Sequence, residues 1–108
     1  MDVKEYETEE GVSPFSDWFN GLDRAAAMRI YGAITRMEHG NFGDHKGVGA
    51  GVMERRLDVG PGYRIYFGRD GEDLVILVGG GTKRRQQRDI ETAKAHWAAY
   101  KRRKKKGR

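Results

Sequence analysis

Two arginines and a tyrosine are placed by the sequence on one face of a predicted β-hairpin, formed by residues 52–58 and 63–68. Side chains alternate between the two faces of a strand, so Arg64 and Tyr66 share a face, and Arg56 of the preceding strand can join them. Arginine makes bidentate contacts to phosphate, and tyrosine can stack on a base or take part in proton transfer. The apolar neighbours are expected to face the helices, which leaves Arg64 exposed.

A basic cluster follows the next predicted strand, 73–79, and adjacent strands would bring it near the same surface. It consists of Lys83, Arg84, Arg85 and Arg88. Such a surface suits metal-free RNA cleavage, in which the 2′-hydroxyl attacks the adjacent phosphate. The enzyme then assists deprotonation of the hydroxyl, neutralises the phosphate and stabilises the leaving 5′-oxygen. The alternative is a half-exposed basic sheet face that only solubilises the domain or binds a protein, and spacing alone does not separate the two.

Other familiar kinds of site are not indicated. Residues 40–51 hold five glycines and are predicted to be a flexible connector, because their spacing matches neither a dinucleotide fingerprint nor a P-loop. The histidines His39, His45 and His96 lack metal-ligand spacing, and there is no cysteine for a disulfide, a zinc site or a thiol nucleophile. We therefore expect no metal and no cofactor. His45, beside Lys46, is expected to be a solvated loop residue, the alternative being that it reaches a substrate.

The elements that must position these residues predict an α+β fold with the order β-α-α-β-β-β-α. An N-terminal helical hairpin and a C-terminal helix would pack on a small, mostly antiparallel sheet. The strand at 73–79 is apolar on both faces and is expected to be central. The expected elements are a strand within residues 2–7, helices beginning after Ser13 and Asp23, strands at 52–58, 63–68 and 73–79, and a last helix buried through Ile90, Ala93, Trp97 and Tyr100.

Charge is distributed unevenly along the 108 residues, which carry 21 Lys and Arg against 16 Asp and Glu. Residues 1–50 hold 5 cations and 9 anions, whereas residues 51–108 hold 16 and 7. This asymmetry suggests an anionic partner for the second half, nucleic acid first. One domain is expected over 1–100. Residues 101–108 carry 7 cations and no anion, and are expected to be a disordered basic tail or the frayed end of the last helix, which either attracts ribosomal RNA or only solubilises the protein.

The sequence also resembles a known family. The stretch GNFGDHKGVGAGVMERRLDVGPGYRIYF, followed by LVILVGGGTKRRQQRDI, resembles toxins of the RelE/ParE superfamily, and within it the HigB-like branch of addiction module killer proteins. That branch shows G-N-F-G-D-x-K, then G-V-x-E-x-R, then G-P-G-Y-R-[VI]-Y and G-G-x-x-K. The resemblance runs from about Pro14 to Trp97.

The resemblance implies a curved sheet and the toxin half of a type II toxin–antitoxin pair that cleaves mRNA on the ribosome without a metal. Arg56 and Arg64 would bind the scissile phosphate, Tyr66 would orient or stack the substrate, and Lys83 would support transition-state charge. The other expected RNA-binding residues are Lys46, Arg55, Arg84, Arg85 and Arg88. Three of these arginines (55, 84 and 85) depart from the family pattern, which favours an anionic substrate and leaves open whether Lys83 or Arg84 occupies the working position.

The expected partners follow from the same resemblance. They are a cognate antitoxin, often a helix-turn-helix protein, the ribosome and mRNA, and operator DNA through the antitoxin complex. The alternatives are a ParE-like inhibitor of DNA gyrase and an inactive relative that only binds its antitoxin. No run of 18 apolar residues and no apolar leader is found, so a cytoplasmic protein without membrane association is expected.

Overall fold

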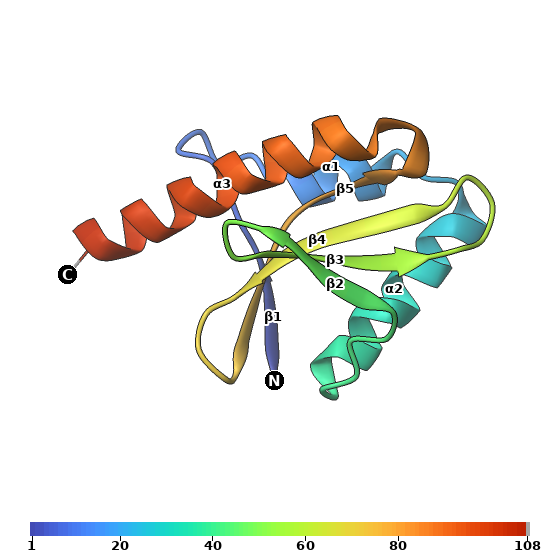
Figure 1. Cartoon of the computed structure of the whole chain (residues 1–108), viewed down its shortest axis with the longest axis horizontal. Helices are drawn as coiled ribbons and strands as arrows, with labels where there is room; N and C mark the ends of the chain where they lie inside the picture. Colours follow the sequence, from blue (N-terminus) through green and yellow to red (C-terminus); the bar gives the residue numbers. More distant parts are fainter. Residues whose placement is uncertain (108) are drawn as a thin grey trace.

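A computed structural model describes residues 1–107 and arranges them around one five-stranded sheet with the strand order β1-β5-β4-β3-β2 (Figure 1). β1 pairs with β5 in parallel, and the other neighbours are antiparallel. The elements are β1 (Asp2–Glu5), α1 (Pro14–Asn20), α2 (Arg24–Glu38), β2 (His45–Gly49), β3 (Val52–Leu57), β4 (Tyr63–Arg69), β5 (Leu74–Thr82), the 3-10 helix η1 (Lys83–Arg85) and α3 (Gln86–Lys106). The predicted α+β class is confirmed, with one strand more than expected.

The two N-terminal helices begin where the sequence predicted. The Ser13 hydroxyl accepts a hydrogen bond from the Ser16 backbone N–H (3.1 Å), and Pro14 occupies the first helical position of α1. At the start of α2, the Asp23 carboxylate accepts from the Ala26 N–H (2.8 Å). Each side chain pairs a backbone donor that the helix leaves without a partner. The residue types at the two starts therefore fix the helical hairpin.

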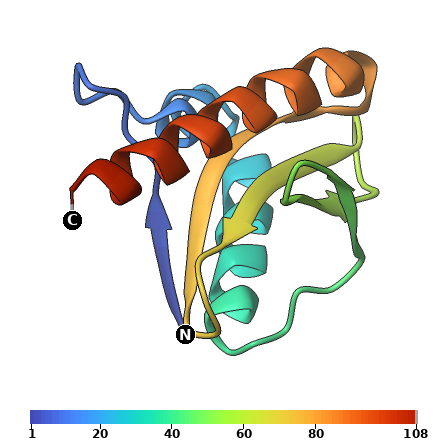
Figure 2. The ribbon, with the colours of Figure 1, turned by 60° about the vertical axis from the view of Figure 1, so that its left-hand side comes forward.

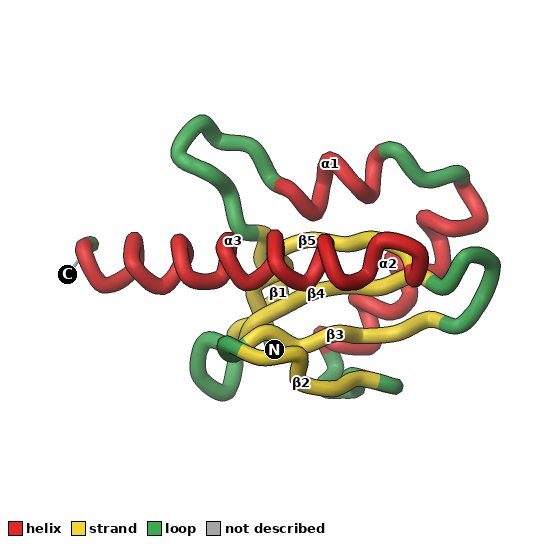
Figure 3. Tube along the Cα trace, turned by 45° about the horizontal axis from the view of Figure 1, so that its top comes forward, coloured by secondary structure: helices red, strands yellow, loops and turns green. Residues whose placement is uncertain are grey.

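Helices cover both faces of the sheet: α1 and α2 lie on one side and α3 crosses the other (Figures 2 and 3). β5 is buried on both faces between β1 and β4, as its apolar sequence predicted. The buried layer on the side of α1 and α2 includes Phe15, Ile30, Met37, Ile65, Phe67 and Leu77. The buried layer on the side of α3 includes Val52, Tyr66, Ile76, Val78, Ile90 and Trp97.

Two tryptophans pack directly on strand glycines and hold the helices close to the sheet. A Cβ added to Gly80 would lie 2.1 Å from the Trp18 ring of α1, and one added to Gly68 would lie 2.5 Å from the Trp97 ring of α3. No heavy atom fits at such distances, so each ring occupies the space that a side chain would need.

Residues 45–49 correct the expectation of a flexible connector, because they form the edge strand β2, antiparallel to β3. The turn between the two strands needs positive φ, which Gly49 (108°), Ala50 (56°) and Gly51 (85°) adopt. Glycine takes that conformation without strain, so the glycines that argued against a regular element instead make a hairpin turn. Val48 packs against the apolar layer under α3 and anchors the strand.

The C-terminal residues follow one of the two alternatives left open by the sequence, since α3 continues to Lys106 and residues 101–106 are the end of the last helix rather than a disordered tail. Cations near a helix C-terminus interact favourably with its dipole. The Arg103 guanidinium donates to the Glu7 carbonyl oxygen (2.6 Å), and the Lys104 ammonium donates to the Asp70 carboxylate (2.5 Å). These contacts tie the end of α3 to the rest of the fold. Within residues 1–107, none of the helices is both long and apolar enough to cross a membrane.

Candidate nucleic-acid interface

The side of the sheet that faces α3 carries the predicted site residues in two neighbouring cross-strand rows. Arg56 of β3 lies opposite Arg64 of β4, and Glu54 lies opposite Tyr66. Lys46 of β2 extends the second row, because it pairs with Glu54. Residues paired in this way lie on the same face. The predicted shared face of Arg56, Arg64 and Tyr66 is therefore confirmed, and Lys46 lies on it too.

A buried carboxylate joins these rows to α3. Glu54 is fully buried, and its Oε2 accepts hydrogen bonds from the Tyr66 hydroxyl (3.2 Å) and the Gln86 side-chain amide (2.8 Å). Its Oε1 lies 4.0 Å from Nε of Arg64, at the outer limit of an ion pair, and both atoms are buried without a hydrogen-bond partner. Glu54 thus couples β3, β4 and the first turn of α3 through one charged group.

Arg64 is buried rather than exposed, with 4% of its surface accessible, which corrects the prediction. Its Nη1 donates to the Tyr63 carbonyl oxygen (3.1 Å) and to the Asp58 carboxylate (3.4 Å). The prediction assumed that helices cover only the opposite, apolar face at this point, whereas the start of α3 covers this one. The Arg64 guanidinium is held in place by protein groups and has little surface to offer a ligand.

Tyr66 is also inaccessible, with 0% of its surface exposed, so in this structure it cannot stack on a base. The pKa of the Tyr66 phenol is raised well above its ordinary value of 10, mainly because the group is buried. The negative charge of Glu54 and the hydrogen bond to it raise this pKa further. The neutral hydroxyl is a donor to Glu54. Tyr66 therefore orients the buried network, and the predicted contact with substrate is not available to it.

The free energy of unfolding is expected to fall above pH 10, and the Tyr66 phenol is expected to cause part of this fall. The folded protein retains the phenolic proton that the unfolded chain releases near pH 10, so this contribution is complete below pH 10 and is lost as the pH rises above it. The midpoint of urea unfolding, measured from pH 8 to pH 11.5, checks this. Tyr66→Phe should flatten the decline relative to the wild type, and an identical decline in both proteins would contradict the assignment.

Exposed cations surround the buried network and form what we call the basic rim. Arg56 is 34% exposed through its side chain and is paired with Asp44 (2.9 Å), which lowers the pKa of the Asp44 carboxyl. The Lys83 backbone N–H donates to the Gly62 carbonyl oxygen (2.8 Å), and a Cβ on Gly62 would lie 3.2 Å from the Lys83 side chain and 3.6 Å from Arg64. Lys83 and Arg64 therefore flank the same glycine. The basic rim consists of Lys46, Arg56, Lys83, Arg84, Arg85 and Arg88.

Arg55 does not belong to this surface, which corrects its assignment as an RNA-binding residue. It pairs with His45 on the opposite face of the sheet and is 9% exposed. Its Nη1 donates to the Arg56 carbonyl oxygen (2.6 Å), and burial, together with the charge of Arg36, lowers its pKa. The His45 ring bonds the Gly43 carbonyl oxygen (2.8 Å) on that same face, so it also lies away from the basic rim.

Asp89 is a further group at the site, and the sequence alone assigned it no functional role. A Cβ on Gly81 would lie 2.0 Å from the Asp89 carboxylate, and Gly81 pairs with Arg64 across β4 and β5. Burial raises the pKa of this carboxyl, although the charges of Arg85 and Arg88 oppose the shift. An acidic residue in the first turn of the last helix, directly after the basic cluster, was the available signal. Asp89 therefore places a half-buried carboxyl against Gly81, close to Arg64 and the basic rim.

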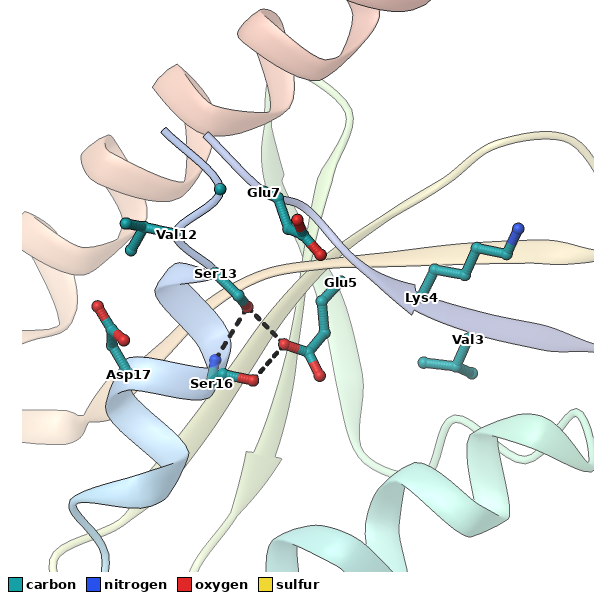
Figure 4. Close-up of a pocket in the computed structure, with 9 residues that line it drawn as sticks. Val3, Lys4, Glu5, Glu7, Val12, Ser13, Ser16 and Asp17 are labelled. Carbon is teal, nitrogen blue, oxygen red and sulfur yellow. Dashed lines mark hydrogen bonds between the residues drawn. The ribbon is translucent and has the colours of Figure 1, made fainter. Parts of the chain in front are cut away.

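An acidic hollow of about 830 Å³ lies between β1, the following loop and α1 (Figure 4). There the Glu5 carboxylate accepts hydrogen bonds from the hydroxyls of Ser13 and Ser16, which tether β1 to the start of α1. Glu7 and Asp17 add negative charge, so the hollow repels phosphate. Among residues 1–107, no group of three or more His, Asp or Glu side chains is arranged to hold a metal ion.

Comparison with known proteins places the chain in a family. No family model matches it. A curated relative from Haemophilus influenzae (strain ATCC 51907 / DSM 11121 / KW20 / Rd), described as an uncharacterized protein, is 43% identical over 81 residues. The aligned part covers 74% of this chain and 82% of the relative. The chain therefore belongs to the same family as this Haemophilus influenzae protein.

Proposed function

We propose that the protein is the toxin of a type II toxin–antitoxin system and that it cleaves mRNA on the ribosome. The observation that carries the proposal is the basic rim, in which Arg56 and Lys83 lie on two sides of the buried Glu54–Arg64 pair. Preorganised cations in that position are what a phosphate gaining charge requires. The resemblance of residues 40–67 to RelE/ParE toxins supports the same assignment, and the α+β fold is consistent with it.

In the reaction that we propose, the RNA 2′-oxygen bonds to the adjacent phosphorus and the bond to the 5′-oxygen breaks, leaving a 2′,3′-cyclic phosphate. The 2′-hydroxyl gives up a proton, and the leaving oxygen gains one. Arg56 and Lys83 bind the phosphate oxygens, and the phosphate displaces Asp44 from Arg56. Asp89 is the carboxyl assigned to proton exchange, because it lies against Gly81, the residue opposite Arg64, and burial raises its pKa above the ordinary value.

The buried residues have a supporting role in this proposal. Arg64 contributes positive charge from behind the Arg56 side chain, and Glu54 and Tyr66 hold it in place. The antitoxin would neutralise the basic rim with an acidic segment, since complementary charge accelerates association and favours the correct partner. The antitoxin would also carry the complex to operator DNA.

Purified protein added to a translation reaction is expected to cut the mRNA within its translated frame, and only when ribosomes are present. Mapping of the 5′ ends of the fragments measures this directly. The proposal would be overturned if the mRNA stayed intact in this reaction and also in cells whose growth the expressed protein stops. In that case, inhibition of DNA supercoiling by gyrase would identify the ParE-like alternative, and no effect on either process would indicate a protein that only binds its antitoxin.

A further inference from the structure

A second basic surface lies at the other end of α3, where the helix meets the β4–β5 turn. A pocket of about 290 Å³ opens there, and we call it the C-terminal pocket. Trp97 and Tyr100 form its aromatic floor and stack with ring centroids 5.2 Å apart and planes 8° from parallel. Trp97 is buried against Gly68, so the half-buried Tyr100 supplies the accessible part of this floor. The cations that line it are Arg69, Lys101, Lys104 and Lys105.

The C-terminal pocket has a fixed wall. The Tyr100 hydroxyl donates to the Asp70 carboxylate (2.7 Å), and Lys104 donates to its other oxygen (2.5 Å). Lys101 holds its ammonium 5.7 Å from the centre of the Trp97 ring. These contacts join α3 to the β4–β5 turn, so the aromatic floor and at least two of the cations are in place before any ligand arrives.

The end of α3 carries more positive charge than the fold compensates. Residues 101–106 are six consecutive exposed cations. Among the described residues, Lys101, Arg102, Lys105 and Lys106 form no ion pair, although Lys101 and Lys105 lie one turn apart, as do Arg102 and Lys106. Like charges at this spacing destabilise a helix. A bound polyanion would relieve that repulsion.

We propose that the C-terminal pocket binds a nucleotide of single-stranded RNA, with its base against the Tyr100 side of the aromatic floor and its phosphate held by Lys101 and Lys105. An aromatic surface next to a row of cations is the combination that binds single strands without sequence preference. An acidic peptide would use the cations and leave the apolar floor without a partner. The identity of the anion as RNA rests on the proposed function.

The position of the pocket makes it a second contact for the strand that occupies the basic rim. Twenty residues of α3 separate Arg85 from Lys105, a rise of about 30 Å at 1.5 Å per residue. Even at the ~3.4 Å per nucleotide of a fully stacked strand, about nine nucleotides are enough to span that length. One RNA strand that follows α3 can therefore reach both surfaces, which are at opposite ends of the helix (Figure 1).

The test measures binding of a labelled ten-nucleotide 2′-O-methyl RNA, which cannot be cleaved, without ribosomes. Lys101→Ala/Lys105→Ala is expected to weaken binding at least about tenfold at low salt and to lower the salt slope by about 0.7, the value for one neutralised single-strand phosphate. The matched control, Arg24→Ala/Arg29→Ala on α2, removes the same charge and should change binding less than twofold. Circular dichroism confirms that both proteins are folded.

Equal losses in the two double variants, or no loss in either, would overturn the proposal. It would also be overturned if an abasic oligomer bound as tightly as the RNA, or if an acidic peptide of equal charge bound more tightly. The assay contains no cleavage step. A wild type that binds through the pocket but cuts no mRNA contradicts only the proposed function, whereas a cutting enzyme indifferent to the pocket variants contradicts only this inference.

Discussion

Replacing Arg64 with methionine is expected to lower the free energy of unfolding by about 3–5 kcal/mol, the usual cost of removing one partner of a buried ion pair. Methionine fills much of the volume of the arginine stem but leaves the Glu54 carboxylate buried without the Arg64 charge beside it. Tyr66 and Gln86 still donate to Oε2, whereas Oε1 loses its charged neighbour. Urea unfolding of the variant and the wild type at pH 7 measures the difference.

A double-mutant cycle separates the charge effect from lost packing. Arg64→Met/Glu54→Gln removes both charges, and the amide oxygen of the introduced glutamine can still accept from Tyr66 and Gln86. The double variant should therefore be more stable than Arg64→Met alone, and strictly additive losses would contradict the coupling. Arg88→Met serves as the control, because this exposed cation should change stability by less than about 0.5 kcal/mol.

Because Arg64 is buried, substitutions of Arg64 cannot by themselves test the proposed active site. The sequence indicated an exposed Arg64 whose removal would leave the fold intact, but the buried side chain makes that variant a stability variant as well. Loss of cleavage in Arg64→Ala would not distinguish a missing phosphate ligand from an unfolded protein. Arg56, which is half-buried, and Lys83, which is exposed, are more accessible than Arg64 and carry the informative substitutions.

Alternation along the strands was enough to predict which residues share a face, and the register confirms it for Arg56, Arg64 and Tyr66. Helix starts were also predictable, because Ser13 and Asp23 act through local hydrogen bonds. Burial was not, since it depends on where α3 crosses the sheet. From sequence alone, an arginine on a strand is predicted to be exposed. Arg64 can be buried because the buried Glu54 carboxylate lies beside it.

The glycine-rich segment and the C-terminal residues also depend on contacts that the sequence does not show, and in both the structure is more ordered than composition indicated. Composition argued against regular structure in 40–51 and left residues 101–108 as either a disordered tail or the end of a helix. Pairing with β3 orders residues 45–49, and contacts to Asp70 and Glu7 hold Lys104 and Arg103 at the end of α3. Contacts between residues distant in sequence decide these cases. Asp89 was overlooked for a related reason, since only its contact with Gly81 places it beside Arg64.

Arg56→Ala and Lys83→Ala are each expected to lower the rate of ribosome-dependent cleavage by about 10²–10³, the effect of removing one preorganised donor to a transition-state oxyanion. Lys83 is exposed, and Arg56 is half-buried but belongs to neither apolar layer, so unfolding midpoints should stay close to the wild type. Single-turnover cleavage of a ribosome-bound mRNA measures the chemical step apart from binding. Arg29→Ala on α2 is the control of equal charge.

The substitution Asp44→Asn removes the same ion pair as Arg56→Ala but is expected not to lower the rate of cleavage. In the free protein, the Asp44 carboxylate forms an ion pair with the Arg56 guanidinium, and the Asp44 side chain is 51% exposed. A phosphate that binds Arg56 must displace this carboxylate. Removing that competitor should leave cleavage unchanged or make RNA binding tighter, although the same ion pair is lost as in Arg56→Ala. Equal loss of cleavage in Asp44→Asn and Arg56→Ala would mean that the ion pair matters for local structure and that Arg56 is not a phosphate ligand. Loss in Arg56→Ala alone follows if the guanidinium itself meets the RNA.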